Sequence, residues 1–504
     1  MLSQSYMVFL LISSRFNSTA IHSNSIRSFS GPVKNERMNT TSDTSTSPKD
    51  QTEGVKALLG DPKKAIIKLA WPMIVAMTVQ TLYSLVDAIW VSGLGADALA
   101  SVGFVFPLLF MGTALATGLG IGGGSAISRK IGAKDKNAAD NAAVHTMILM
   151  VILAVLYTIP LFVFSDSIFQ AIGAGRTTET ASVYARIMYS ATIISFFAFI
   201  ANAILRSEGD AKRAMLAMVL GGIINVILDP IFIYTLNLGV PGAAYASVLS
   251  MSISALLLFY WLFLKKDTYV SFSFREFHFD TSIMKDILLV GLPASVMQLS
   301  MSIMMFMMNI IIERVGGIDG VAVFSAGWRV ATMASMPLLG MATAVVSVTG
   351  AAYGARAYEK IDVAHLYALK IGIIIETSIA VVTFVFAPAI TAAFTQSADT
   401  ARIADDIITF LRIICIFYPA TAFGMLSSAA FQGVGKGIYS LMATVLRTII
   451  LIVPLAWTFA VLLGWGLIGA WWGLVIANII GGAIAFIWMK VYVNGLLKKP
   501  LPIG

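Results

Sequence analysis

Residues 213–236 read RAMLAMVLGGIINVILDPIFIYTL, and this stretch decides the class of the fold. A run of this length crosses the roughly 30 Å hydrocarbon core of a membrane as one helix. It nevertheless holds an acid, Asp229, far from either end. An ionised side chain in that position costs at least about 2.5 kcal/mol, so an acid kept there is a candidate functional residue.

Two neighbours of Asp229 indicate how a site is built around it. Asn225 lies one helical turn earlier and therefore on the same face of a helix. Pro230 removes a backbone donor and disfavours α geometry at the preceding residue. We therefore expect a helix break at Pro230, free backbone oxygens beside the carboxylate, and a site for a cation or a proton.

The composition extends this conclusion to the whole chain. Of 504 residues, 58% are hydrophobic and 12% are charged, whereas soluble domains carry roughly 25% charged residues. The net charge of +8 arises mostly in short segments between apolar runs, where it sets membrane topology and does not indicate nucleic-acid binding. Cys415 is the only cysteine in the sequence, which excludes an intramolecular disulfide and a cysteine-based metal site.

Twelve apolar runs follow one another from Ile66 onward, each long enough to span a bilayer. They cover residues 66–92, 98–125, 141–164, 182–205, 213–236, 242–264, 284–312, 322–350, 363–387, 403–430, 437–463 and 467–493. The fold class is therefore an all-α polytopic membrane protein. Most basic residues of the loops fall on one side, so the positive-inside rule predicts that both termini are cytoplasmic.

The two halves of the chain repeat one another at a nearly constant spacing along the sequence. The matched positions are Pro72 with Pro293, Gly132 with Gly354, Pro230 with Pro454, and Gly239 with Gly466. Since each half has six spans, both halves enter the membrane in the same sense and are related by an axis along the membrane normal. We expect an N-lobe at 56–265, a cytoplasmic linker at 266–283, a C-lobe at 284–493 and a tail at 494–504.

The N-terminal stretch at 1–55 differs from the rest of the chain. It is rich in Ser and other polar residues, and we expect it to be disordered. Met38 is an alternative start.

Four stretches together resemble the multidrug and toxic compound extrusion (MATE) family, over about residues 60 to 490. They are LAWP at 69–72, YSLVDAIWVSGLG at 83–95, NAILRSEGDAKRA at 202–214 and NVILDP at 225–230. The prokaryotic branch with two aspartates in the N-lobe is the most similar. The resemblance implies a polyspecific exporter in a cell membrane, driven by inward flow of H⁺ or Na⁺ and working without an organic cofactor. Its expected partners are the lipid bilayer and small organic compounds, mostly cationic or amphipathic, and the chain is expected to act as a monomer.

The depth of each residue in the membrane, estimated from its position along its span, predicts the coupling site. At a rise of about 1.5 Å per residue, Asp87 on the first span and Asp229 on the fifth lie at similar depth, and Ser247 on the sixth joins them. With Asn225, these residues form a hard-oxygen set suited to Na⁺, or a carboxylate pair that shares one proton. The family pattern supports the four positions, although it predicts Thr where this chain has Ser247. The second half carries Asn309 and Val453 at the positions of the two acids, so the site belongs to the N-lobe.

Substrate contacts are predicted from flexible and polar side chains near that site, since methionine adapts to varied apolar ligands. The candidates are Met73, Met77, Gln80, Tyr184, Asn202 and Met251. Plain packing is the competing interpretation of the methionines. Pro72 is a candidate kink that lets the first span bend, with a static kink as the alternative.

Glu376, in the middle of the ninth span, is a candidate second acid, for which Arg412 and Arg447 are possible partners. The alternative is that it pairs locally or faces a cavity without a coupling role. Among other functions, a flippase for lipids or lipid-linked saccharides is the nearest rival and should show a cavity lined by cationic side chains. An enzyme is disfavoured, because the four histidines are scattered and no HExxH motif occurs.

Overall fold

The structure, a computed structural model, describes residues 52–272, 277–395 and 401–498, and the regular elements in these ranges are helices. The α-helices are α2 (Glu53–Leu59), α3 (Pro62–Ser92), α4 (Ala96–Gly132), α5 (Lys136–Val163), α6 (Ser165–Ala171), α7 (Thr178–Ser190), α8 (Thr192–Ser207), α9 (Ala211–Pro230), α10 (Gly239–Phe259), α11 (Thr281–Ala334), α12 (Met336–Gly354), α13 (Tyr358–Val385), α14 (Ala387–Ala392), α16 (Ala404–Ile414), α17 (Tyr418–Gly433), α18 (Gly437–Val445), α19 (Ile452–Trp457) and α20 (Gly466–Leu497). The all-helical class predicted from the sequence is confirmed.

The number of membrane spans agrees with the twelve apolar runs. Within the described ranges, 11 helices are long and apolar enough to span, and the count reaches 12 when α7 and α8, bent by 48°, form one span. The predicted seventh and eighth spans are joined in α11, where Gly317 has a non-helical backbone (φ 59°, ψ −157°). Glycine permits this conformation because it has no Cβ. The eighth span continues from there through α12.

Both ends of the helical body extend beyond the predicted boundaries. The expected disordered tail reached position 55, but α2 begins at Glu53, and the Thr52 hydroxyl caps it by accepting from the Val55 N–H at 3.3 Å. Residues 1–51, with the alternative start at Met38, lie outside the described part. At the other end α20 continues to Leu497, so the tail expected from 494 begins later.

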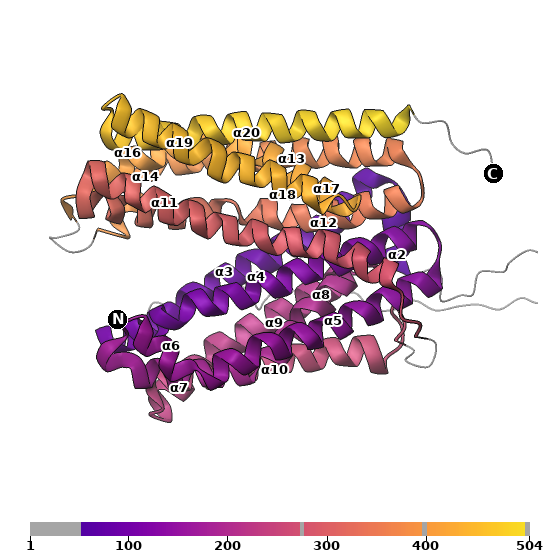
Figure 1. Cartoon of the computed structure of the whole chain (residues 1–504), viewed down its shortest axis with the longest axis horizontal. Coiled ribbons are helices and arrows are strands. Elements are labelled where there is room, and N and C mark those ends of the chain that lie inside the picture. Colours follow the sequence, from indigo (N-terminus) through magenta and orange to yellow (C-terminus); the bar gives the residue numbers. More distant parts are fainter. Residues whose placement is uncertain (1–51, 273–276, 396–400, 499–504) are drawn as a thin grey trace, which may run out of the picture. The chain divides into compact units, whose positions relative to one another are not determined.

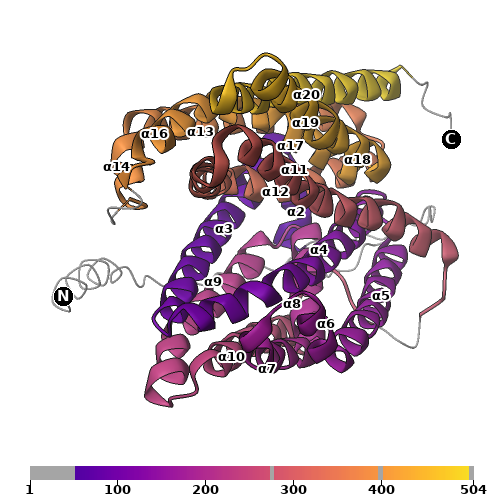
Figure 2. The same cartoon turned by 60° about the vertical axis from the view of Figure 1, so that its left-hand side comes forward.

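The transmembrane helices form two sets that follow the two halves of the sequence. Helices α3–α10 make the N-half, and α11–α20 make the C-half. In Figure 1 the N-half is indigo to magenta, and the C-half is mostly orange to yellow. The principal packing between the halves pairs α4 with α11 and α3 with α12, and Figure 2 shows α12 beside α3 and α4.

Contacts between the halves are reciprocal. The Ala351 backbone leaves no room for a Cβ at Gly132, and the Arg129 backbone leaves none at Gly354. In the repeat, Arg129 matches Ala351 and Gly132 matches Gly354, so the same contact is made twice in opposite directions. Such a self-complementary interface is the mark of a two-fold axis.

A second reciprocal contact lies further along the same helices. Gly118 packs against the backbone of Ser295, and Gly340 packs against the backbone of Ile74. Gly118 matches Gly340 in the repeat, and Ile74 matches Ser295. The repeat inferred from sequence is therefore a structural pseudo-two-fold, with α4 and α12 closest to its axis.

One end of the helical body collects turns that carry or adjoin basic residues. These turns lie at 133–135, 208–210, 355–357 and 434–436, beside residues 265–272, and we call this the basic end. Here Lys360 donates to the carbonyl oxygens of Leu59 and Gly60 at 2.7 and 3.0 Å. Arg129 pairs with Asp286 at 3.5 Å across the halves. The halves are thus joined by polar contacts at the basic end.

Candidate functional site

Three of the four residues predicted to bind a cation meet in the N-half, between α9 and α10. The Asn225 side-chain amide donates to Asp229 Oδ1 at 3.1 Å and to Ser247 Oγ at 3.3 Å. Asp229 is 0% exposed and Asn225 is 2% exposed. One turn of helix separates Asn225 from Asp229, which is why both reach the same point.

Asp87 completes the set from α3. Its carboxyl group lies beside that of Asp229, close enough for a side-chain hydrogen bond when one of the two holds a proton. Tyr83 and Tyr184 lie within electrostatic range of both acids. We call Asp87, Asn225, Asp229 and Ser247 the acid site.

Two oxygens of the acid site, Asn225 Oδ1 and Asp229 Oδ2, are buried without a hydrogen-bond partner among the residues that the structure describes. A buried polar atom without a partner is costly, so the site has capacity for a further donor or a cation. The described residues hold no group of three or more His, Cys, Asp or Glu side chains placed for a metal. The available ligands are two carboxyls, an amide oxygen and a hydroxyl, which suit a proton or a hard monovalent cation rather than a transition metal.

The two prolines predicted to kink a helix, Pro230 and Pro72, have different effects on helix geometry. Regular α geometry stops at Pro230, because a π-helical turn follows at Ile231–Thr235. Asp229 and Pro230 themselves remain in α9, so the structure has a π turn after Pro230 where the sequence predicted a helix break at Pro230. By contrast, α3 continues through Pro72 as one α-helix from Pro62 to Ser92.

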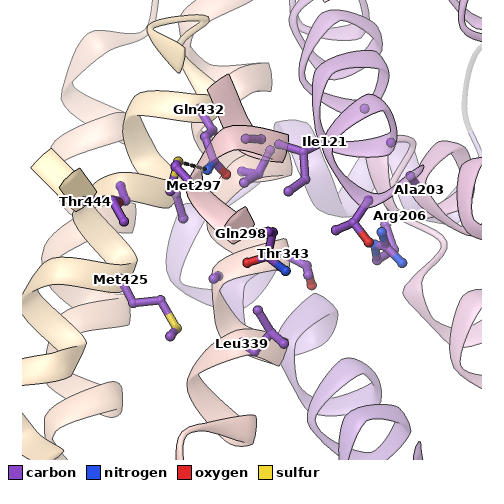
Figure 3. A pocket seen from close by; sticks show the side chains of 18 of the residues that line it. Ile121, Ala203, Arg206, Met297, Gln298, Leu339, Thr343, Met425, Gln432 and Thr444 are labelled. Carbon is purple, nitrogen blue, oxygen red and sulfur yellow. Dashed lines mark hydrogen bonds between the residues drawn. The ribbon is translucent and has the colours of Figure 1, made fainter. Parts of the chain in front are cut away.

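A cavity of about 220 Å³ lies between the halves, and we call it the inter-half cavity. Figure 3 shows Ala203 and Arg206 of the N-half facing Met425 and Thr444 of the C-half, with Gln298 and Thr343 between them. The lining positions of α4 recur at the matching positions of α12. These pairs are Thr117 with Leu339, Gly120 with Ala342, Ile121 with Thr343, and Gly124 with Val346.

Comparison with known proteins fits this arrangement. The MatE family model matches residues 72–231 and 293–458, which are one stretch in each half. This chain belongs to the MATE family. The multidrug export protein MepA of Staphylococcus aureus (strain MSSA476) is 24% identical over 420 residues, which cover 82% of this chain and 90% of MepA.

Solved MATE structures are more similar still. A MATE transporter in the straight conformation is 49% identical, with a TM-score of 0.87, over 89% of this chain and 100% of the other. An outward-facing multidrug resistance MATE transporter of the MOP superfamily is 50% identical, with a TM-score of 0.86, over 89% of this chain and 99% of the other. The chain is therefore a multi-pass membrane transporter of a multidrug efflux family and not an enzyme.

The substrate residues predicted for this MATE chain do not line the inter-half cavity. Met73 is buried at 1% exposure, where α3 packs on Gly340. Met77 and Gln80 are also on α3, and the positions of the C-half that match them, Gln298 and Met301, line the cavity instead. The repeat therefore carries information about the cavity-lining residues, Gln298 and Met301, that the first span alone does not contain.

The other three candidates are spread over the N-half. Tyr184 lies near the acid site. The Asn202 side-chain amide donates to the Ala214 carbonyl at 2.9 Å, and its oxygen accepts from Arg206. Met251 accepts from Ser195 through its sulfur at 3.3 Å. The six candidates thus do not form one pocket.

Glu376 does not have the partners suggested from the sequence. It is 0% exposed, and within the described ranges neither of its carboxyl oxygens has a hydrogen-bond partner. Arg412 lies over the Phe384 ring at 5.5 Å, while Arg447 donates to the Asn478 oxygen at 3.1 Å. The expectation of local pairing is wrong, because both arginines are engaged elsewhere.

Proposed function

We propose that this MATE chain is a cation-coupled antiporter that exports amphipathic organic compounds, mostly cations, by alternating access. The observation that carries the proposal is the acid site. Two neighbouring carboxyls, those of Asp87 and Asp229, lie within a transmembrane half, where ionisable groups mark ion pathways. Among the described residues, one buried oxygen of Asp229 has no hydrogen-bond partner. MepA, a relative, is a multidrug export protein.

The coupling ion is H⁺ or Na⁺. Asp87 and Asp229 can share one proton, because two like charges at close range disfavour double ionisation. The same carboxyls, with Asn225 Oδ1 and Ser247 Oγ, also offer oxygen ligands to Na⁺. Either ion supplies positive charge where two acids would otherwise repel each other.

The pseudo-two-fold supports the transport cycle. The two halves, proposed as lobes at 56–265 and 284–493 joined by the linker at 266–283, rock against each other around the inter-half cavity. One chain contains both lobes, so a monomer suffices. The basic end is proposed to face the cytoplasm of a prokaryotic cell, and Pro72 to be a point at which α3 bends when Asp87 gains its ion.

Transport into or out of proteoliposomes tests the proposal, with pH and Na⁺ gradients imposed separately on an organic cation such as ethidium. Asp87→Asn and Asp229→Asn keep the shape of the side chains and remove their charge. Each is expected to reduce gradient-driven transport by at least about tenfold, the range of a typical coupling energy. The gradient that drives the wild type identifies the ion.

Glu376→Gln is the matched control, because it removes another fully buried acid from the C-half. It should retain coupled transport. Wild-type rates in either aspartate variant would refute the two-aspartate mechanism. Movement of a lipid-linked saccharide without movement of any organic cation would instead favour a flippase.

A further inference from the structure

We propose that the inter-half cavity binds an amphipathic organic anion through Arg206 of the N-half and Arg447 of the C-half. The ligand class is an organic carboxylate, sulfonate or phosphate with an apolar body. This inference goes beyond the proposed function, because the cavity shares no residue with the acid site and the charge it attracts is opposite.

The charges of the lining carry the argument. Arg206 and Arg447 both line the cavity, and no Asp or Glu is among its lining residues. Each guanidinium contacts a neutral amide, since Arg206 donates to Asn202 and Arg447 donates to Asn478 at 3.1 Å. In the described part of the chain neither forms an ion pair with an acid. A guanidinium stays charged at any physiological pH, so the cavity wall carries two positive charges that no protein carboxylate balances.

Such charges are costly where they are removed from water, unless a counter-charge reaches them. Each amide oxygen engages only part of a guanidinium, which has five N–H donors in a planar fork. That fork matches the oxygens of a carboxylate, sulfonate or phosphate. The missing partner is therefore an anion with two or three oxygens.

The remaining lining suits the rest of such a molecule. Gln298, Gln432 and Thr343 supply neutral hydrogen-bonding groups in the same lining. Met297, Met301 and Met425 line the same cavity, and methionine adapts to apolar bodies of varied shape. A volume of about 220 Å³ holds a head group and a small ring system, and lies below the range of roughly 300–1,000 Å³ for drug-sized ligands.

The arginines are not a by-product of the repeat. The small lining residues follow the pseudo-symmetry, as the matched pair Ala203 and Ala429 shows. At the same offset Arg206 is matched by Gln432, which also lines the cavity but is uncharged. Packing about the two-fold axis is thus compatible with a neutral side chain here, so the positive charge has another role.

Binding to the protein in phosphatidylcholine nanodiscs tests the inference. The probe is naphthalene-2-sulfonate, and its control is naphthalene-2-sulfonamide, which has the same ring and no charge. We expect the wild type to bind the sulfonate at least about tenfold more tightly than the sulfonamide, because a charge-assisted contact is lost in the latter. R206Q and R447Q should each weaken sulfonate binding by about tenfold and leave the sulfonamide unchanged, whereas R206K and R447K should retain most of the affinity.

Arg412→Gln is the matched control variant, because Arg412 lies on α16 outside the cavity. It should bind the sulfonate as the wild type does. Asp87→Asn should also bind it normally, which separates this site from the acid site. If the wild type binds the sulfonate and sulfonamide equally, the proposal fails, and this comparison needs no variant to fold. Unchanged sulfonate binding to folded R206Q and R447Q would also overturn it.

A further arm identifies the natural source of the anion. Phosphatidylglycerol in the nanodiscs should lower sulfonate binding if a lipid head group occupies the cavity. Binding that is insensitive to phosphatidylglycerol indicates a soluble anion. Both results support an anion site, and they differ only in the origin of the ligand.

Discussion

At the scale of single residues, Glu208 is a buried acid at the basic end. It is 2% exposed in the turn between α8 and α9, and its Oε2 accepts from the Val270 N–H of the linker at 2.9 Å. Burial raises the pKa of Glu208 to about 8, with Asp210 adding to the rise while the Val270 N–H and Arg213 oppose it. Arg213 itself is paired with Asp267 at 2.6 Å.

This carboxyl should make stability depend on pH. A carboxyl whose pKa is higher in the folded than in the unfolded protein stabilises the fold most below the unfolded value, and that contribution is lost as pH rises through the folded value. We expect the thermal midpoint in detergent to fall by roughly 5 °C or more between pH 5 and pH 9. Glu208→Gln should remove most of this fall, since Gln remains neutral and can still accept from Val270.

Glu359→Gln is the control, because Glu359 is an exposed acid at the same end. It should leave the pH profile of the midpoint unchanged. An equally steep fall in the Glu208→Gln protein would show that Glu208 is not the group responsible.

At the scale of helices, the acid site was largely predictable and the cavity was not. Asp87, Asn225, Asp229 and Ser247 could be brought together from depth alone, because helix rise is constant and membrane spans share a common frame. The rotation of a helix about its own axis is set by its neighbours. Met77 was therefore assigned to a substrate pocket, although its counterpart in the C-half, Gln298, faces the cavity.

The close packing of α4 on α12 gives a prediction of its own. A methyl group at Gly354 would collide with the Arg129 carbonyl, a backbone atom that cannot rotate away. Gly354→Ala should therefore loosen the contact between the halves at the basic end. Ser128, which is 0% exposed and packs against Gly350, reports on this contact.

In a Cys415→Ala background, Ser128→Cys should react slowly with a water-soluble maleimide. Adding Gly354→Ala should speed the reaction about tenfold, the effect of about 1.4 kcal/mol on the opening equilibrium. Gly103→Ala is the control, since no atom lies within 4 Å of a Cβ placed there. An unchanged rate with Gly354→Ala would mean that the halves absorb the methyl group without parting.

At the scale of the whole molecule, the backbone of the two halves is symmetric and their charged side chains are not. The backbone repeats closely: Lys134 (φ 57°) and Arg356 (φ 55°), which match in the repeat, are both in the left-handed region where α4 and α12 end. The charged groups do not repeat, because the C-half has Asn309 and Val453 in place of Asp87 and Asp229. Two similar halves can rock against each other, while the differing side chains confine the proposed ion site to one of them.

The direction of transport depends on which end of the molecule faces the cytoplasm. The positive-inside rule places the basic end there, because loops rich in Lys and Arg stay on the cytoplasmic side. Cysteines introduced at exposed positions of the Cys415→Ala protein test this: Ala355 lies at the basic end, and Glu179 lies at the start of α7 at the opposite end. In intact cells an impermeant maleimide should label Glu179→Cys, whereas Ala355→Cys should need permeabilisation. Because the membrane excludes the reagent, labelling of Glu179→Cys should exceed that of Ala355→Cys roughly tenfold or more in intact cells. Labelling of Ala355→Cys alone in intact cells would invert the topology and, with it, the direction of the proposed antiport.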